Sequence, residues 1–198
     1  MMDVSILCPG PSVELYDRNH ESDRGRSYIM AVNRAILFES STFNFKKVDL
    51  WCILDWVFYR KMIAEVDVSC DLLTSHASLS QLSRQSIKHN GKVNLVDDVT
   101  DPDPSQKIDV RGSPGKQFVF NWRLFTVTSA IVWAYHLGAK QITLFGADMV
   151  GAQDWDGYSD ELYVRDENRW VNSEQTLIES LSDWLASRGV TLCRLIRV

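Results

Sequence analysis

The chain alternates short apolar runs with longer stretches in which apolar residues recur every three or four positions. Seven runs have the length and composition of buried β-strands. They cover residues 4–8, 28–32, 48–54, 72–74, 93–96, 141–145 and 190–195. Helical periodicity occupies residues 56–66, 121–137 and 173–188. This alternation predicts an α/β fold, with a mostly parallel sheet and helices on both of its faces.

Composition places the chain among ordinary globular proteins. With 198 residues, 45% hydrophobic and 24% charged, it is expected to form one domain spanning residues 1–198. The net charge of −5 and the lack of long basic runs do not indicate nucleic-acid binding. No apolar stretch is long enough for a membrane span, and no signal peptide precedes the first strand, so we expect a cytoplasmic protein. The four cysteines lack CxxC spacing and are expected to be free, buried thiols.

Two segments interrupt the pattern. Residues 97–117 contain several prolines, glycines and aspartates, and are expected to form an irregular loop. Residues 150–170 are acidic and carry interleaved aromatic side chains, including Trp155 and Tyr158. Because a polar loop of this length inside a compact domain is often functional, we expect residues 150–170 to form a lid.

Polar residues follow several of the predicted strands. In a parallel sheet the carboxyl ends of the strands converge on one crevice, where α/β proteins bind nucleotides and phosphates. The candidate site residues at this edge, including the start of the long central helix, are Gly10, Pro11, Ser12, Asn33, Asp55, Thr128, Ser129 and Asp148.

Most of these residues also have a purely structural interpretation. Ser12 can cap a helix that begins at Val13. Asn33 is equally suited to cap a short helix over residues 34–39, and Asp55 to cap the helix that starts at Trp56. Thr128 and Ser129 could return a hydrogen bond to the preceding turn. Asp148 leaves a buried strand beside a glycine, where a carboxylate normally has a hydrogen-bonding or metal-binding role.

Motifs for several other chemistries are absent. The sequence contains no GxSxG, GxxxxGK[ST] or GxGxxG motif. Its four histidines are not spaced as metal ligands, so no metal site is predicted from them. The acidic residues Asp154 and Asp156 could contribute to a Mg²⁺ site, although nothing in the sequence fixes their geometry.

The order of these motifs resembles two related groups of proteins. Gly-Pro-Ser follows the first strand, Asn the second and a polar residue the third, and Thr-Ser begins the segment TSAIVWAYHLGAKQITLFGADM. This order resembles the small bacterial sialyltransferases of glycosyltransferase family 42. It also resembles proteins similar to archaeal 6-hydroxymethylpterin diphosphokinases, which include phage and bacterial members. The resemblance covers residues 4–55 and 125–148, and implies a single Rossmann-like, GT-A-like domain with a lid.

The sialyltransferase resemblance implies specific roles for the candidate residues. By position, a cytidine monophosphate (CMP) sugar donor would lie against Gly10, Pro11, Ser12, Asn33, Asp55, Thr128 and Ser129, without a metal or other cofactor. The chain departs from that family in reading Cys8-Pro9-Gly10-Pro11-Ser12 where members usually read Gly-Asn-Gly-Pro-Ser. It also lacks a histidine before the last helix, where the family has its catalytic histidine. A carboxylate would then act as the base, and Asp148 and Asp156 are the predicted catalytic residues.

These observations favour a transferase that uses a nucleotide-activated donor, most simply a nucleotide sugar, with the acceptor left open. One alternative is a Mg²⁺-dependent enzyme that transfers diphosphate to a pterin-like acceptor. Another is a phage-like binding domain that keeps the fold without catalysis. A homo-oligomer is expected only on the general frequency of such assemblies.

Overall fold

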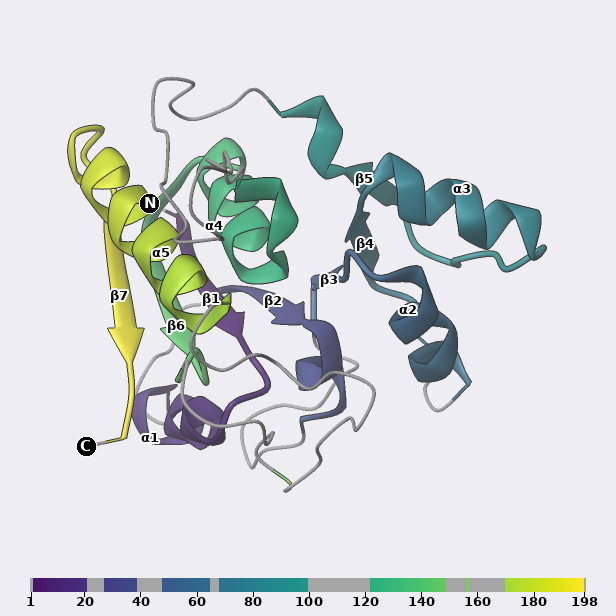
Figure 1. Ribbon diagram of the computed structural model, residues 1–198. Coiled ribbons are helices and arrows are strands. Elements are labelled where there is room, and N and C mark those ends of the chain that lie inside the picture. Colours follow the sequence, from purple (N-terminus) through teal and green to yellow (C-terminus); the bar gives the residue numbers. More distant parts are fainter. Residues whose placement is uncertain are drawn as a thin grey trace, which may run out of the picture.

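The computed structural model of the chain describes residues 2–20, 27–38, 48–64, 68–99, 122–148, 156 and 170–197. Seven strands and five α-helices, with several 3₁₀ turns, make up this described part (Figure 1). The strands are β1 (Met2–Leu7), β2 (Tyr28–Val32), β3 (Leu50–Cys52), β4 (Asp71–Thr74), β5 (Val93–Leu95), β6 (Ala139–Phe145) and β7 (Thr191–Leu195). The α-helices are α1 (Leu15–His20), α2 (Trp56–Ile63), α3 (His76–Arg84), α4 (Thr126–His136) and α5 (Trp170–Ala186).

The seven strands form one sheet in the order β5-β4-β3-β2-β1-β6-β7. Every pair of neighbours is parallel. The chain therefore builds the sheet outward from β1 to β5, then returns to place β6 on the other side of β1. This reversal of direction is the topological switch point of a Rossmann-like fold. The predicted α/β fold with a parallel sheet is confirmed.

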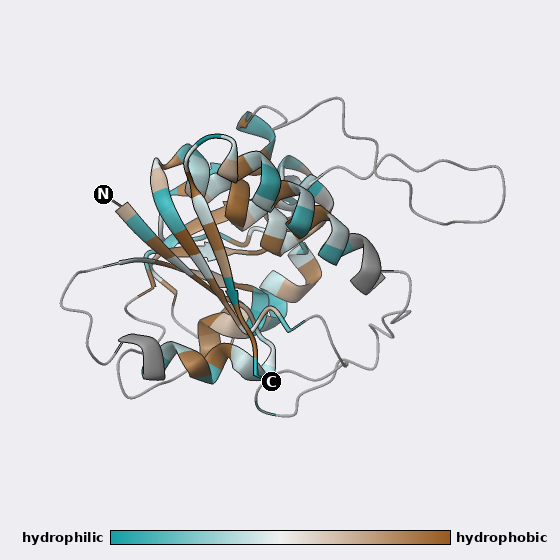
Figure 2. Cartoon of the chain, turned by 90° about the vertical axis from the view of Figure 1, so that its left-hand side faces the viewer, coloured by the Kyte–Doolittle hydropathy of each residue, from teal (hydrophilic) through white to brown (hydrophobic). Residues whose placement is uncertain are grey.

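Helices cover both faces of the sheet, as predicted. On one face, α4 and α5 pack over the strands in a cluster that includes Ile131, Ile178 and Leu185. On the other, α1, α2, α3 and two 3₁₀ turns contribute a second cluster that includes Val13, Ile36 and Tyr59. Figure 2 shows hydrophobic residues gathered between the helices and the strands, with hydrophilic residues outside. Central strands buried on both faces read as continuous apolar runs, which explains the sequence pattern.

The helix α5 shows how the apolar pattern becomes packing energy. Leu177, Ile178, Leu181 and Leu185 lie on one face and are at most 5% exposed. Burying each such side chain contributes roughly 1.5–3 kcal/mol before the loss of conformational entropy is subtracted. The helix begins at Trp170, three residues before the predicted start and inside the predicted lid.

The helix α3 was missed from the sequence. Its residues, HASLSQLSR, contain few apolar side chains, so helical periodicity is weak. The helix forms because the Ser75 hydroxyl accepts a hydrogen bond from the Ser78 amide at its start, and because Leu82 is buried against the second cluster. A serine cap of this kind stabilises a helix by about 1 kcal/mol.

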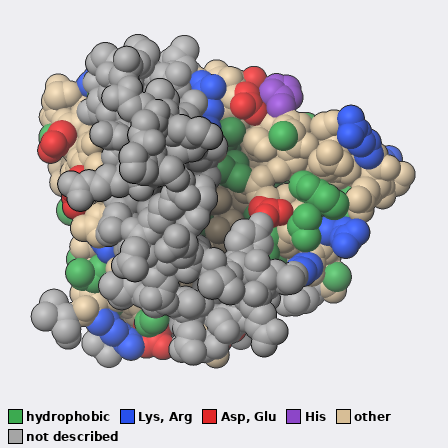
Figure 3. Space-filling model, viewed as in Figure 1, with side chains coloured by type: hydrophobic (Ala, Val, Ile, Leu, Met, Phe, Trp, Pro, Cys, Tyr) green, Lys and Arg blue, Asp and Glu red, His purple; other side chains and the backbone are tan. Residues whose placement is uncertain are grey.

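The outer surface of α2 and α3 carries hydrophobic and basic side chains side by side (Figure 3). Val57 is 36% exposed, and the guanidinium of Arg60 lies 5.8 Å from the centre of the Trp56 ring. The long side chain of Arg60 therefore covers part of this aromatic surface, as basic side chains commonly do on helices.

Two further expectations concern cysteines and membranes. All four cysteines are free; Cys8 and Cys52 are buried, whereas Cys70 and Cys193 are half-buried. No helix in the described segments combines the length and apolar character that crossing a membrane requires. Of the predicted irregular loop at 97–117, the structure describes only residues 97–99, which begin inside the 3₁₀ turn Val96–Asp98; the remainder lies outside the described residues.

Candidate functional site at the switch point of the sheet

The loops that follow β1 and β6 meet at the switch point. The amide of Cys8 donates to the carbonyl of Phe145 at 2.7 Å, and the amide of Gly10 donates to the carbonyl of Gly146 at 2.9 Å. The ladder between β1 and β6 is thus extended beyond the last paired residues, Leu7 and Phe145. This brings the loop of Gly10, Pro11 and Ser12 against the residues from Gly146 to Asp148. Ser12 and Asp148 are 136 positions apart in the sequence.

Two glycines make this close approach possible. A Cβ atom on Gly10 would lie 2.4 Å from the carbonyl oxygen of Gly146 and 2.4 Å from Oδ2 of Asp148. Gly146 has a φ of +73°, and a Cβ atom there would lie 2.2 Å from the carbonyl oxygen of Cys8. Glycine is therefore required at both positions, by contact at Gly10 and by contact and backbone conformation at Gly146.

Asp148 binds Ser12 through both of its carboxylate oxygens. The Ser12 amide donates to Oδ2 at 2.9 Å, and the Ser12 hydroxyl donates to Oδ1. Ser12 is fully buried, so these two donors would be costly to leave without an acceptor. The sequence interpretation that Asp148 has a hydrogen-bonding role matches this geometry, and its further role as a base stays a prediction.

The 3₁₀ turn Pro11–Glu14 begins two residues before the predicted helix start at Val13. Gly10 occupies the cap position, and no side chain caps the turn. The Ser12 hydroxyl, which was expected to cap this helix, instead donates to Asp148 and accepts a hydrogen bond from the Arg197 amide at 2.8 Å.

The last strand and the residues after it hold both loops. Arg194 of β7 donates from Nε to the carbonyl of Ala147 at 2.6 Å, and from Nη2 to the carbonyl of Asp148 at 2.8 Å. Arg197 donates its amide to Ser12 and pairs its guanidinium with Glu14. Three segments, from the start, the later part and the end of the chain, therefore contact one another at the switch point.

Cys8 lies at the base of this arrangement and is buried. Burial, and to a smaller extent the carboxylates of Glu174 and Asp148, raise the pKa of its thiol well above the ordinary value. Cys8 therefore stays protonated at neutral pH and is not set up as a nucleophile, because the thiolate is the reactive form.

Asn33 follows β2 at the same edge of the sheet, with an unusual backbone conformation. Its φ is +50°, in the left-handed region that asparagine tolerates better than most residues. Its carbonyl accepts a hydrogen bond from the buried indole Nε1 of Trp51 at 2.9 Å. The 3₁₀ turn Asn33–Leu37 has no side-chain cap hydrogen bond, so Asn33 is not the predicted cap. Within the described residues, no hydrogen bond of its side-chain amide is found.

Arg34, which sequence reasoning did not select, forms an ion pair with Asp156. Nη1 lies 3.1 Å from Oδ1 and Nη2 lies 2.9 Å from Oδ2. Asp156, together with Trp170 at the start of α5, is the part of the predicted lid that the structure describes; Asp154, Trp155 and Tyr158 lie outside the described residues. A contact between residues 122 positions apart has no local sequence signal, although Arg34 directly follows the candidate site residue Asn33.

The remaining candidates have structural partners. Asp55 caps α2, since its Oδ1 accepts from the amides of Val57 at 2.8 Å and Phe58 at 3.3 Å. Thr128 and Ser129 are fully buried. Thr128 donates to the carbonyls of Trp122 and Phe125, and Ser129 contacts the Trp122 carbonyl at 3.4 Å. These are the structural alternatives that the sequence had left open. A direct role in ligand binding stays a prediction for all three.

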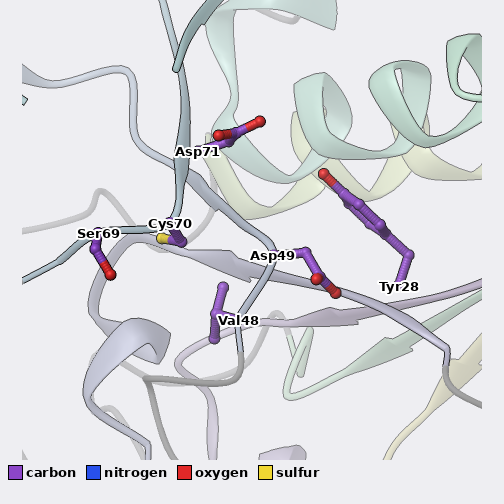
Figure 4. Close-up of a pocket in the computed structure, with 6 residues that line it drawn as sticks. All are labelled: Tyr28, Val48, Asp49, Ser69, Cys70 and Asp71. Carbon is purple, nitrogen blue, oxygen red and sulfur yellow. The ribbon is translucent and has the colours of Figure 1, made fainter. Parts of the chain in front are cut away.

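A pocket of about 380 Å³ lies at the opposite, amino-terminal edge of the sheet (Figure 4). Its lining residues are Tyr28, Val48, Asp49, Ser69, Cys70 and Asp71. Asp49 accepts from the Ile29 amide at 2.9 Å, and Asp71 accepts from the Lys92 amide at 3.2 Å. Both carboxylates thus bind main-chain amides near the starts of strands, which accounts for their presence at this edge. No cluster of three or more His, Cys, Asp or Glu suited to a metal ion occurs among the described residues.

The fold and the position of its switch point define a Rossmann-like α/β protein with a candidate site at the carboxyl edge of the sheet. The sequence matches no model of a known protein family, and no curated protein sequence matches it. Among solved structures, the chain is similar to the MAf glycosyltransferase from Magnetospirillum magneticum AMB-1, with a TM-score of 0.56 and 18% sequence identity. The similarity covers 100% of this chain and 34% of that chain, so the chain spans about a third of its neighbour's length. At this identity, the similarity shows a shared fold.

Proposed function

We propose that this domain is a glycosyltransferase domain that transfers a sugar from a nucleotide-activated donor. The observation that carries the proposal is the switch point, where glycine contacts bring the loops after β1 and β6 together at the carboxyl edge of a parallel sheet. Rossmann-like sheets bind nucleotides at this place. The fold similarity to a glycosyltransferase supports sugar transfer over other nucleotide chemistry.

The proposed donor site extends along the edge from the Gly10–Ser12 loop to Asn33. Asn33 is half-buried and directly follows β2, the neighbour of β1, and its side-chain amide makes no hydrogen bond to the described part of the chain. An amide of this kind can both donate to and accept from a nucleotide. Asn33 is therefore the residue proposed to contact the donor directly, whereas Ser12 and Asp148 are proposed to hold the loop in place.

The proposal is tested by measuring the thermal unfolding midpoint with a panel of nucleotides: CMP, CDP, UDP, GDP and ATP, each with and without Mg²⁺. A ligand present at 100 times its Kd stabilises the folded state by about 2.7 kcal/mol. CMP is the donor nucleotide expected from the sialyltransferase resemblance. Asn33→Ala is expected to lose the shift. Its ligand-free midpoint is expected to fall by a few degrees, because the φ of +50° suits asparagine better than alanine.

Each other result has a distinct meaning. A shift only with ATP and Mg²⁺ would favour the diphosphate-transfer alternative, and the glycosyltransferase proposal would be withdrawn. A folded protein that responds to none of the nucleotides would favour the non-catalytic binding domain. A normal shift in Asn33→Ala would refute the placement of the donor beside Asn33.

A further inference from the structure

The ion pair of Arg34 and Asp156 has the geometry with which arginine recognises anionic ligands. Both terminal nitrogens of the guanidinium face one carboxylate, at 3.1 and 2.9 Å. Carboxylate and phosphate groups both accept this two-pronged pair of hydrogen bonds. The guanidinium is therefore already oriented to bind an anion, and in this structure the anion is a side chain of the protein.

The two partners differ in their access to solvent. The Arg34 side chain is 9% exposed, whereas that of Asp156 is 40% exposed. Burying a guanidinium costs several kcal/mol unless an anion compensates for the lost hydration. The guanidinium is thus buried, while the carboxylate that it contacts is partly accessible to solvent.

Arg34 is also fixed on a rigid part of the sheet edge. The next two residues of its 3₁₀ turn, Ala35 and Ile36, are fully buried in the second hydrophobic cluster. The preceding residue, Asn33, is tied to Trp51 through its carbonyl. The functional group therefore has a preorganised support, which reduces the entropic cost of binding.

The strand register places Arg34 beside the candidate donor site. Leu7 of β1 lies opposite Ala31 of β2. Gly10 and Arg34 each stand three residues beyond this pair, and so leave the same edge of two adjacent parallel strands. Neighbouring strands in a sheet are about 4.8 Å apart, so β1 and β2 lead Gly10 and Arg34 to the same carboxyl edge of the sheet.

We propose that Arg34 recognises a phosphate group of the nucleotide-activated donor, and that Asp156 occupies the same guanidinium when no donor is bound. The identity of the ligand rests on the proposed function. The exchange replaces one pair of charge-assisted hydrogen bonds with another, and no covalent bond changes. Asp156 thereby sets a threshold for binding, because an incoming anion must compete with a carboxylate of the protein itself.

The test measures the Kd of CMP and of inorganic pyrophosphate by isothermal titration calorimetry for five variants and the unaltered protein. Asp156→Asn removes the competing charge and is expected to tighten binding about fivefold, the range of a moderately exposed ion pair. Arg34→Gln is expected to weaken binding by more than about tenfold. Asp98→Asn and Arg84→Gln remove one charge of each sign from exposed residues of the Val96–Asp98 turn and of α3, and are expected to change nothing.

Arg34→Lys distinguishes a loss of ligand binding from a loss of folding. It keeps the charge but not the two-pronged geometry, so its affinity is expected to fall between those of the unaltered protein and Arg34→Gln. Ligand-free thermal midpoints are measured in parallel. If Arg34→Gln is unfolded, the comparison of Arg34→Lys with Asp156→Asn decides the question.

The outcomes separate this inference from the proposed function. Equal or weaker binding in Asp156→Asn overturns the competition, and unchanged binding in the Arg34 variants overturns anion recognition. Nucleotide binding with the same Kd in all these variants leaves the proposed function intact and refutes only the inference. Pyrophosphate binding that follows the expected order, without any nucleotide binding, supports Arg34 and refutes the nucleotide donor. Absence of binding of both probes in every variant refutes both.

Discussion

Replacing Asp148 with alanine is expected to lower the free energy of unfolding by about 3 kcal/mol. The variant leaves the Ser12 amide and hydroxyl without their acceptor, and Ser12 is fully buried. Each hydrogen bond to a charged group contributes about 1.5–3 kcal/mol. Asp148 itself is half-buried, so water can replace part of what is lost, and the expected total lies at the lower end of the sum. For a chain of this length, the corresponding decrease in Tm is about 6–12 °C.

A double-mutant cycle shows whether this loss comes from the contact with Ser12. Ser12→Ala removes the hydroxyl but keeps the amide, and is expected to cost about half as much. The double variant is expected to be more stable than the sum of the two losses predicts, by about 1.5 kcal/mol. The free energy of unfolding of Asp148→Asn should lie between that of the unaltered protein and that of Asp148→Ala. Its amide oxygen can accept from the Ser12 amide, but its NH₂ group must face the Ser12 hydroxyl.

The assay is urea unfolding followed by tryptophan fluorescence, for which the chain has seven tryptophans. Unchanged m-values are required for the comparison, because they show that the unfolding transition exposes the same surface. Losses that add within about 0.5 kcal/mol, or a loss below about 1 kcal/mol for Asp148→Ala, would refute the reasoning. Asp98→Ala, at an exposed position, serves as the matched control.

Three further predictions concern stability. Gly146→Ala is expected to lower the free energy of unfolding in urea by more than about 3 kcal/mol, because its Cβ would meet the Cys8 carbonyl. Gly189→Ala, with a φ of +69° and open space around it, should lower it by only about 1–2 kcal/mol. Equal losses in the two variants would contradict the role of the close contact. Asp55→Ala should cost about 1 kcal/mol by removing the cap of α2, and unchanged stability on thermal unfolding would argue against it. Burial raises the pKa of the Cys70 thiol from 9.0 to about 12; the folded state therefore keeps a proton that the unfolded state releases, and stability should fall as pH rises from 9 towards 12. Cys70→Ala should show a shallower decline between pH 8 and pH 10.5, and an identical decline would contradict this assignment.

Much of the fold could be predicted from the sequence, because its signals are local. The apolar runs correspond to all seven strands, and the strand–helix alternation correctly implied a parallel sheet. The helix α5 was recognised from an apolar face repeated every three or four residues. The helix α3 was missed because its stability depends on a serine cap and on one buried leucine, which leave little periodicity to detect.

The site was located by position, but its contacts were not predicted. Sequence reasoning selected Ser12, Asn33, Asp148 and Asp156 because they follow predicted strands or lie in the acidic loop. It assigned Ser12 to a helix cap, whereas the structure pairs Ser12 with Asp148 and with the Arg197 amide. It did not select Arg194 at all, because an arginine in a terminal strand gives no indication of which carbonyls it will reach.

The sequence by itself therefore determined where the strands and the strongly periodic helices form, since apolar periodicity and turn chemistry act over a few residues. It also determined that polar groups would gather at one edge of the sheet, since parallel strands all end there. Only the tertiary structure decided which of these groups meet. Ser12 contacts Asp148 across 136 positions, Arg34 contacts Asp156 across 122, and Arg197 contacts Ser12 across 185. Such contacts depend on strand order, which no local stretch of sequence encodes. They also depend on a close approach that Gly10 and Gly146 permit only once β1 and β6 are paired.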